Sequence, residues 1–193
     1  MNRIVVFCGS SLGFNSVYRE AAISLGNHFV KQNIGLVYGG GKIGMMGALA
    51  DTILAQSGEV IGVIPKLLEK EEVVHANVEE MIVCKNMSER KVIMSKLVDG
   101  YITLPGGFGT LDELFEALTL NQLHIEQKPV GLLNINGFFD ATVLQIDKMV
   151  AEGYVKPENK ALLIVENTVE KLLEKMNQYQ APEITHIINK VVR

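Results

Sequence analysis

The feature that most constrains the fold of this chain is an alternation of two hydrophobic patterns. Short runs of consecutive apolar, mostly β-branched residues are separated by longer stretches in which apolar residues recur every three to four positions. The short runs predict strands at residues 4–8, 35–38, 60–64, 81–84, 100–104, 130–133 and 162–165. Strands that are apolar on consecutive positions are covered on both faces, so the alternation predicts βαβ units around a buried parallel sheet.

The longer stretches predict helices at residues 16–32, 43–56, 88–98, 110–123, 138–152 and 169–178. Right-handed crossovers between parallel strands then give an α/β fold, a doubly wound parallel sheet in a Rossmann-like three-layer sandwich. Residues 65–75 are charged and lack periodicity, which predicts a long excursion at the sheet edge. A length of 193 residues fits a single nucleotide-binding domain over 1–193, with 181–193 as a C-terminal appendage after Pro182.

Composition excludes several classes of function. The formal net charge of -4 supplies no field that would attract DNA or RNA, so we expect no nucleic-acid partner. No apolar run reaches the roughly 18 residues of a membrane helix and no signal-peptide pattern begins the chain, so we expect a cytoplasmic protein with no membrane partner. Cys8 and Cys84 lie in predicted strands and the four histidines are scattered, so neither a disulfide framework nor a metal site is expected.

Glycine-rich sequences follow three of the predicted strands. They are Gly9-Ser10-Ser11, Gly39-Gly40-Gly41-Lys42 and Pro105-Gly106-Gly107-Phe108-Gly109-Thr110. Glycine lets a ligand approach the backbone, and the start of a helix offers free N–H groups, so each cluster can bind an anion or simply make a tight turn. Three clusters at one sheet edge favour a phosphate site. The pattern matches neither a P-loop nor a dinucleotide-binding fingerprint.

Carboxylates follow the glycines of the fifth predicted strand. Thr110 is suited to cap a helix, and Asp112, Glu113 and Glu116 fall in its first two turns. One interpretation is a Thr110–Glu113 capping box with acidic residues that complement the helix dipole. The other is a site for a ribose 5-phosphate, with backbone amides on the phosphate and carboxylates near the sugar or an attacking water.

A basic pair, Arg90 and Lys91, begins the preceding predicted helix. Positive charge in a first helical turn opposes the helix dipole, which indicates an anionic partner. That partner is either a ligand or a carboxylate in a surface salt bridge, such as Glu89 or Asp112.

Taken together, these motifs resemble one family. The sequence PGGFGTLDE at 105–113, with MSERK at 87–91 and YGGG at 38–41, is similar to the LOG ("lonely guy") proteins. These are cytokinin riboside 5'-monophosphate phosphoribohydrolases, many of them once labelled lysine decarboxylase-like. The resemblance covers about residues 3–165. It implies hydrolysis of the N-glycosidic bond of AMP or N6-modified AMP to free base and ribose 5-phosphate, without a cofactor, by a homodimer.

The resemblance also assigns residues. It implies that Arg90 and Glu113 are the catalytic pair, and that nucleotide contacts fall on Glu72, Lys91, Gly107, Phe108, Gly109, Thr110, Leu111, Asp112 and Thr119. Many members carry glutamate where this chain has Asp112. Reasoning from the residues themselves adds Gly106, Ser10 and Gly40 as phosphate contacts and Glu116 as a contact to the sugar.

Two other functions compete with hydrolysis. A non-catalytic nucleotide-binding or carrier protein could use the same fold and phosphate site. A nucleic-acid-associated module is a weaker alternative because of the acidic balance. The decarboxylase label is disfavoured because pyridoxal phosphate chemistry needs a Schiff-base lysine and a carboxylate on the ring nitrogen, and no such constellation stands out. For hydrolysis, Glu113 would stabilise the oxocarbenium ion and either attack C1' covalently or activate water, and the sequence leaves both open. Arg90, which stays protonated, would act electrostatically.

Overall fold

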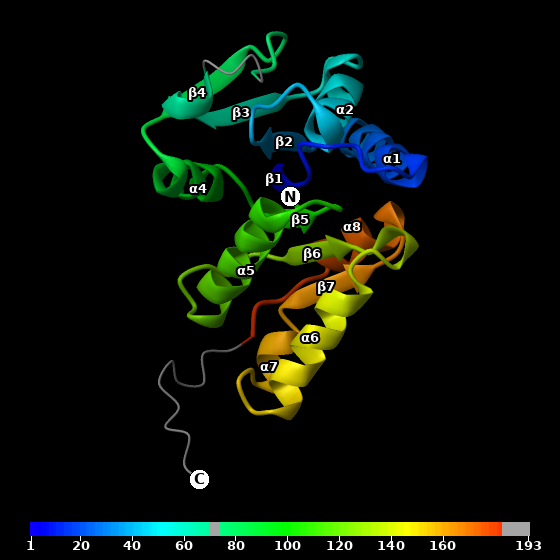
Figure 1. Ribbon diagram of the computed structural model, residues 1–193, viewed down its shortest axis with the longest axis vertical. Coiled ribbons are helices and arrows are strands. Elements are labelled where there is room, and N and C mark those ends of the chain that lie inside the picture. The colour runs from blue at the N-terminus through cyan, green and yellow to red at the C-terminus, as the bar shows by residue number, and fades with distance from the viewer. Residues whose placement is uncertain (70–73, 183–193) are drawn as a thin grey trace.

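The computed structural model describes residues 1–69 and 74–182. Seven parallel strands form one sheet in the order β4-β3-β2-β1-β5-β6-β7, which runs from the top of Figure 1 to the bottom. Their bounds are β1 Arg3–Phe7, β2 Gly35–Tyr38, β3 Val60–Pro65, β4 Glu80–Cys84, β5 Gly100–Thr103, β6 Val130–Leu133 and β7 Leu163–Glu166. The predicted α/β class and doubly wound parallel sheet are confirmed.

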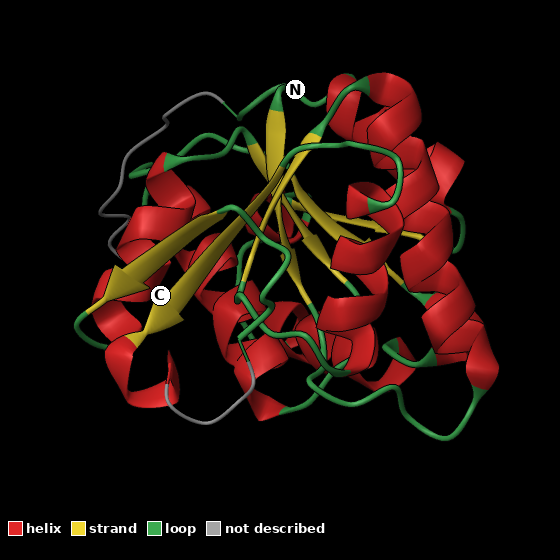
Figure 2. Ribbon diagram, turned by 90° about the horizontal axis from the view of Figure 1, so that it is seen from above, coloured by secondary structure: helices red, strands yellow, loops and turns green. Residues whose placement is uncertain are grey.

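Helices cover both faces of the sheet, as Figure 2 shows. Their bounds are α1 Ser16–Gln32, α2 Gly44–Leu54, α3 Lys66–Glu69, α4 Met87–Lys96, α5 Phe108–Gln122, η1 Ile135–Gly137, α6 Asp140–Ala151, α7 Pro157–Lys160 and α8 Val169–Asn177. The helices α1, α2 and α8 pack on one face through residues such as Leu25, Leu49 and Leu172. On the other face, α4 and α5 contribute Met94 and Leu114. Figure 1 shows the first group to the right of the strands and α4 and α5 to the left.

The chain order creates a crevice beside β1. Along the chain, β2, β3 and β4 are added one after another on one side of β1, whereas β5 pairs with the other side of β1. There Ile4 pairs with Gly100 and Phe7 with Thr103. The connections after β1 and β5 therefore leave on opposite faces of the sheet. In open α/β sheets, ligands bind outside the carboxyl ends of the strands at this kind of reversal.

Asparagine side chains begin two helices, and glycine begins a third. Asn15 accepts a hydrogen bond from Val17 N–H (3.1 Å) at the start of α1, and Asn86 accepts one from Glu89 N–H (2.9 Å) at the start of α4. Helix α5, however, begins at Phe108 after Gly107, with no side-chain cap. The expectation that Thr110 caps this helix is therefore wrong: Thr110 is its third residue and is buried.

The predicted excursion after β3 begins with the short helix α3 and returns to the sheet edge at His75. His75 N–H donates to the Gly40 carbonyl (2.9 Å), and its ring nitrogen Nε2 lies 3.0 Å from Asp51 Oδ1. Glu72 lies outside the described residues, as does nearly all of the C-terminal segment 181–193. Within the described part of the chain, none of the helices is long and apolar enough to cross a membrane.

Candidate active site at the carboxyl edge

The turns after β1 and β5 touch through their backbones. Gly9 N–H donates to the Pro105 carbonyl (3.1 Å), and a Cβ atom on Gly106 would lie only 2.8 Å from Gly9 N. A recess of about 310 Å³ opens beside this contact, lined by Gly9, Ser10, Ser11, Leu12, Gly13, Tyr18, Met45, Pro105, Gly106, Gly107 and Phe138. Two of the three glycine clusters thus meet at one place, as the sequence predicted.

Helix α5 points its free N-terminus at this place. The first N–H groups of a helix have no partner within it, and here no side chain caps them. Gly107 and Gly109 are exposed, and a Cβ atom on either would have no neighbour within 4 Å. Packing therefore does not require glycine at these two positions, unlike Gly106, where a Cβ would collide with Thr110 Oγ1. The open backbone at 107–109 is suited to accept an anion.

Arg90 reaches the same edge from α4. Its Nε donates to the Val63 carbonyl (3.0 Å), and its guanidinium lies against Gly39, where any Cβ atom would collide with Nη2. The third glycine cluster therefore makes room for an arginine. In the described part of the chain, no carboxylate forms an ion pair with Arg90, so the salt-bridge alternative does not apply to it. Its charge is available to a ligand.

Glu113 lies one helical turn beyond the free N-terminus of α5. Burial raises the pKa of Glu113, while the positive charges of Arg90 and Lys91 act in the opposite direction. Burial also raises the pKa of the Cys8 thiol, and the charge of Glu113 adds to that rise, so Glu113 is near the end of β1. A half-buried carboxylate close to a guanidinium is an arrangement typical of active sites.

Lys91 and Asp112, both expected to touch the substrate, pair with each other. Lys91 Nζ lies 2.7 Å from Asp112 Oδ2 and also contacts Glu116. Burial acts to lower the pKa of Lys91, but its hydrogen bonds to Asp112 and Glu116 outweigh burial and raise it. For Lys91 the salt-bridge interpretation therefore holds, and this pair links α4 to α5 beside Glu113.

The other predicted residues are spread over several places. Gly40 is buried, and a Cβ atom on it would lie 2.9 Å from Met81 Sδ. Thr119 donates to the Phe115 carbonyl (2.7 Å) and lines a separate recess of about 210 Å³ between α5 and α6. Ser10 is exposed at the rim, whereas Leu111 is partly buried and packs in the core between the sheet, α4 and α5.

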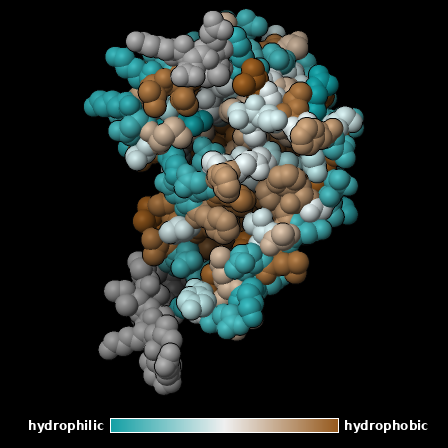
Figure 3. Space-filling model, viewed as in Figure 1, coloured by the Kyte–Doolittle hydropathy of each residue, from teal (hydrophilic) through white to brown (hydrophobic). Residues whose placement is uncertain are grey.

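Sequence reasoning missed an aromatic wall of the recess. The rings of Tyr18 and Phe138 pack edge to face with centroids 5.5 Å apart, and both line the recess. Phe138 belongs to the connection that leaves the carboxyl end of β6. The rule that ligand-binding residues follow the carboxyl ends of parallel strands could therefore have predicted it. Figure 3 shows hydrophobic residues gathered in the middle of the face in view. Among the described residues, no three His, Cys, Asp or Glu side chains form a metal-binding group.

Comparisons with known proteins identify relatives of this chain. A family described as "Possible lysine decarboxylase" matches residues 46–176. The chain is 45% identical over 177 residues to cytokinin riboside 5'-monophosphate phosphoribohydrolase LOG3 of Arabidopsis thaliana, covering 92% of this chain and 82% of the relative. It is also 45% identical to the probable phosphoribohydrolase LOGL1 of rice, Oryza sativa subsp. japonica, covering 92% of this chain and 79% of the relative.

Solved structures share the fold at lower identity. The molybdenum cofactor binding protein of Rippkaea orientalis superposes with a TM-score of 0.70 at 21% identity, covering 92% of this chain and 97% of that one. The molybdenum cofactor carrier protein of Chlamydomonas reinhardtii gives 0.69 at 22% identity, covering 91% and 96%. At such identity, the likeness concerns the fold alone.

Proposed function

Because this chain belongs to the LOG family of cytokinin riboside 5'-monophosphate phosphoribohydrolases, we propose that it hydrolyses the N-glycosidic bond of AMP or an N6-substituted AMP. The products are the free base and ribose 5-phosphate. One observation carries the proposal: the uncapped N-terminus of α5, the carboxylate of Glu113 one turn along and the guanidinium of Arg90, which has no ion pair among the described residues, lie together at the carboxyl edge. The curated relatives favour this hydrolase over the carrier alternative.

The 5'-phosphate binds at the start of α5 in this proposal. The N–H groups of Phe108, Gly109 and Thr110 and the positive end of the helix dipole stabilise its charge. Open space around Gly107 and Gly109 supports this placement, since a phosphate can approach the backbone there. Binding energy from the phosphate, which does not react, positions the sugar for the chemical step.

Glu113 faces the anomeric carbon of the ribose. As the bond from C1' to the base breaks, the bonding electrons leave with the base and positive charge builds on the sugar. The carboxylate of Glu113 stabilises that charge and accepts a proton from the water whose oxygen bonds to C1'. The departing base takes up a proton from solvent water, and Glu113 returns its own proton to solvent, so the carboxylate is restored. The pKa of Glu113, raised by burial, makes it a stronger base than an exposed glutamate.

Arg90 stabilises the departing base or the phosphate. A guanidinium stays protonated far above neutral pH, so it donates hydrogen bonds and charge rather than a proton. Its anchor on Val63 and its contact with Gly39 hold it in place before the substrate arrives. A charge fixed in advance needs little reorganisation during the reaction.

The lysine beside Glu113 is poorly suited to the decarboxylase chemistry in the family description. A Schiff base forms from a neutral amine, so a catalytic lysine needs a lowered pKa. Asp112 and Glu116 instead raise the pKa of Lys91 and keep it protonated. This supports hydrolysis over decarboxylation.

The homodimer remains a prediction. Leu123 and Ile125, just after α5, are 40% and 66% exposed, and Leu144 and Tyr154 are also exposed. Exposed apolar side chains of this kind are suited to a subunit interface. Light scattering on the purified protein would measure its mass in solution, and a monomer across the working concentration range would contradict the prediction.

Base release tests the proposed function directly. We expect purified protein to convert AMP or N6-isopentenyl-AMP into free base and ribose 5-phosphate, separated by chromatography, with relative rates that define the preferred base. Adenosine, which has no phosphate for α5 to bind, should react at least about 100-fold more slowly in kcat/KM. Tight binding of both nucleotides without any base release would favour the carrier alternative instead.

A further inference from the structure

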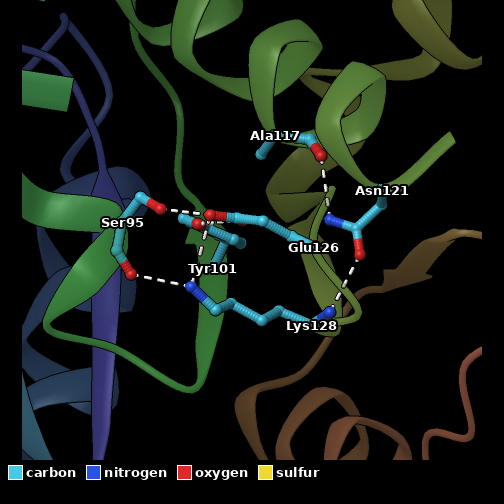
Figure 4. Close-up of polar contacts among 6 residues, drawn as sticks. All are labelled: Ser95, Tyr101, Ala117, Asn121, Glu126 and Lys128. Carbon is cyan, nitrogen blue, oxygen red and sulfur yellow. Dashed lines mark hydrogen bonds and ion pairs between the residues drawn. The ribbon is translucent and has the colours of Figure 1, made fainter. Parts of the chain in front are cut away.

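We propose that Glu126 is a positioning residue, which acts through a buried network to fix the orientation of α4 relative to α5 and hence of Arg90 relative to Glu113. The Glu126 network consists of Ser95, Tyr101, Glu126 and Lys128 (Figure 4). The proposal rests on the proposed function, because it concerns the geometry of the catalytic pair.

Glu126 joins three separate parts of the fold. It belongs to the connection that leaves α5 and leads to β6. One carboxylate oxygen accepts a hydrogen bond from the Ser95 hydroxyl of α4, and the other accepts one from the Tyr101 hydroxyl of β5. The Glu126 side chain is only 10% exposed. Burial and the hydrogen bond to Glu126 raise the pKa of Tyr101, so its hydroxyl keeps the proton that it donates.

Lys128 completes the network and neutralises it. Its ammonium donates to the Ser95 carbonyl (2.7 Å) near the end of α4, lies 3.3 Å from Glu126 Oε1, and sits 5.6 Å from the centre of the Tyr101 ring. Its backbone N–H donates to Asn121 Oδ1 (2.8 Å), and the Asn121 amide donates to the Ala117 carbonyl (2.9 Å). The connection after α5 is therefore attached to both helices.

The network is bonded to the two helices that carry the catalytic pair. Ser95 follows Arg90 by five residues on α4, and Ala117 follows Glu113 by one turn on α5. A small cavity of about 30 Å³ lies between the helices, bordered by Lys91, Ser95, Tyr101, Glu113 and Ala117 among others. Two sets of polar links therefore join α4 and α5 around this incomplete packing. Lys91 bonds to Asp112 and Glu116 beside the catalytic residues, and the Glu126 network is bonded to Ser95 near the end of α4.

A buried carboxylate is a demanding way to join two helices. Its charge needs several donors in fixed places, whereas apolar side chains of similar volume could fill the same space in several arrangements. The two hydroxyls and the ammonium around Glu126 meet that need in one arrangement of α4, α5 and β5. Loss of the carboxylate would let α4 shift, and an error of about 1 Å in a catalytic group can reduce the rate about 100-fold.

Steady-state kinetics on folded variants test the inference. We expect Glu126→Ala to lower kcat for AMP about 10-fold or more, with KM within about 3-fold of wild type because the amides at the start of α5 are untouched. Glu126→Gln should stay within about 3-fold of the wild-type kcat, since the amide oxygen still accepts from one hydroxyl and the NH2 donates to the oxygen of the other. The matched control is Glu59→Gln, which weakens an ion pair at the opposite edge of the sheet and should leave kcat unchanged.

A kcat for Glu126→Ala within 2-fold of wild type, whatever its melting temperature, would overturn the proposal. If Glu126→Ala does not fold, Ser95→Ala and Tyr101→Phe replace it, because each removes one hydrogen bond to Glu126. We expect kcat to fall about 3-fold in each variant. An unchanged kcat in both would also overturn the proposal.

A spin-label measurement separates this inference from the proposed function. Labels at Val92→Cys on α4 and Gln122→Cys on α5, both exposed, report the arrangement of the two helices without any substrate. The distance distribution should shift or broaden in Glu126→Ala and not in Glu59→Gln. A distance distribution that is unchanged in Glu126→Ala refutes the positioning role. If the distribution shifts in Glu126→Ala but the wild-type protein releases no base, only the proposed hydrolysis is refuted.

Discussion

The amino edge of the sheet, where its strands begin, and the carboxyl edge, where they end, differ in how completely their polar groups are hydrogen-bonded or paired. The amino edge has the larger hollow, about 800 Å³, lined by Arg3, Glu59 and Asp99 among others. Its charges are paired there: Arg3 Nε donates to Glu59 Oε2 (3.0 Å), and Asp99 Oδ2 accepts from Asn2 N–H (2.6 Å). The carboxyl edge has a recess of only about 310 Å³.

The carboxyl edge, in contrast, keeps N–H groups and a positive charge that are not neutralised in the described part of the chain. Helix α5 begins without a side-chain cap, and Arg90 forms no ion pair within the described residues. Fixed polar groups that are already paired have little left to offer a ligand, whereas free N–H groups and an unpaired charge are stabilised when one binds. In this protein, unsatisfied polar groups indicate the functional edge better than volume does.

Removal of the proposed catalytic carboxylate should have the largest effect. We expect Glu113→Gln to lower kcat for base release at least about 100-fold while AMP still binds, because the charge that stabilises the sugar is lost and the phosphate site is intact. Melting should stay at or above the wild-type temperature, since the variant removes a buried charge. Glu116→Gln, one turn further along the same helix, is the matched control and should lose less than about 10-fold. Equal losses in both variants would argue against a special role for Glu113.

A negative charge at the start of α5 should break the phosphate site without harming the fold. Gly109→Glu places a carboxylate in open space at the positive end of the helix dipole, which stabilises the helix by about 0.3–1 kcal/mol. The same charge repels the phosphate, so we expect KM for AMP to rise at least about 10-fold and the melting temperature to rise as well.

The control for this variant is Gly109→Gln, which has the same shape without the charge. It should raise KM much less in the same kinetic assay. If both substitutions leave KM unchanged, the phosphate binds elsewhere and the contrast between the two edges loses its main support.

The pH profile should sharpen the comparison further. Burial raises the pKa of Glu113, and the ionised form is the active one, so the acid limb of kcat/KM should lie above the usual carboxyl value of 4.5. The Lys91 charge lowers this pKa, so Lys91→Met should move the acid limb to higher pH. A limb that stays in place in Lys91→Met would mean that another group titrates.

Sequence patterns predicted the sheet well because buried parallel strands are visible in sequence. The consecutive apolar run at 4–8, for example, became β1 Arg3–Phe7, and the predicted helix over 16–32 became α1 with the same bounds. Glycine clusters at strand ends predicted that two of these turns would meet at the carboxyl edge, since parallel strands end on one side.

The start of α5 and the partners of the charged residues could not be predicted in the same way. A glycine such as Gly107 can begin a helix without any side-chain signal, so Thr110 was the better candidate by sequence. Whether Lys91 contacts a ligand or Asp112 depends on how α4 and α5 pack, which no local pattern specifies. Glu126 lies in a connection without periodicity, and its role as acceptor for Ser95 and Tyr101 arises only when distant segments meet.

The amino edge should respond only in stability, and only slightly. Arg3 and Glu59 are roughly 37% and 46% exposed, so solvent screens their ion pair, and Glu59→Gln should lower the free energy of unfolding at pH 7 by about 1 kcal/mol or less with kcat unchanged. The hydrogen bond from Arg3 lowers the pKa of Glu59, so the pair stabilises the fold above the ordinary carboxyl pKa. That contribution is lost as pH falls through the lowered pKa, so urea unfolding of wild type and Glu59→Gln should converge in acid. A loss of kcat in this variant would mean that the amino edge is coupled to the chemistry, against the division between the two edges.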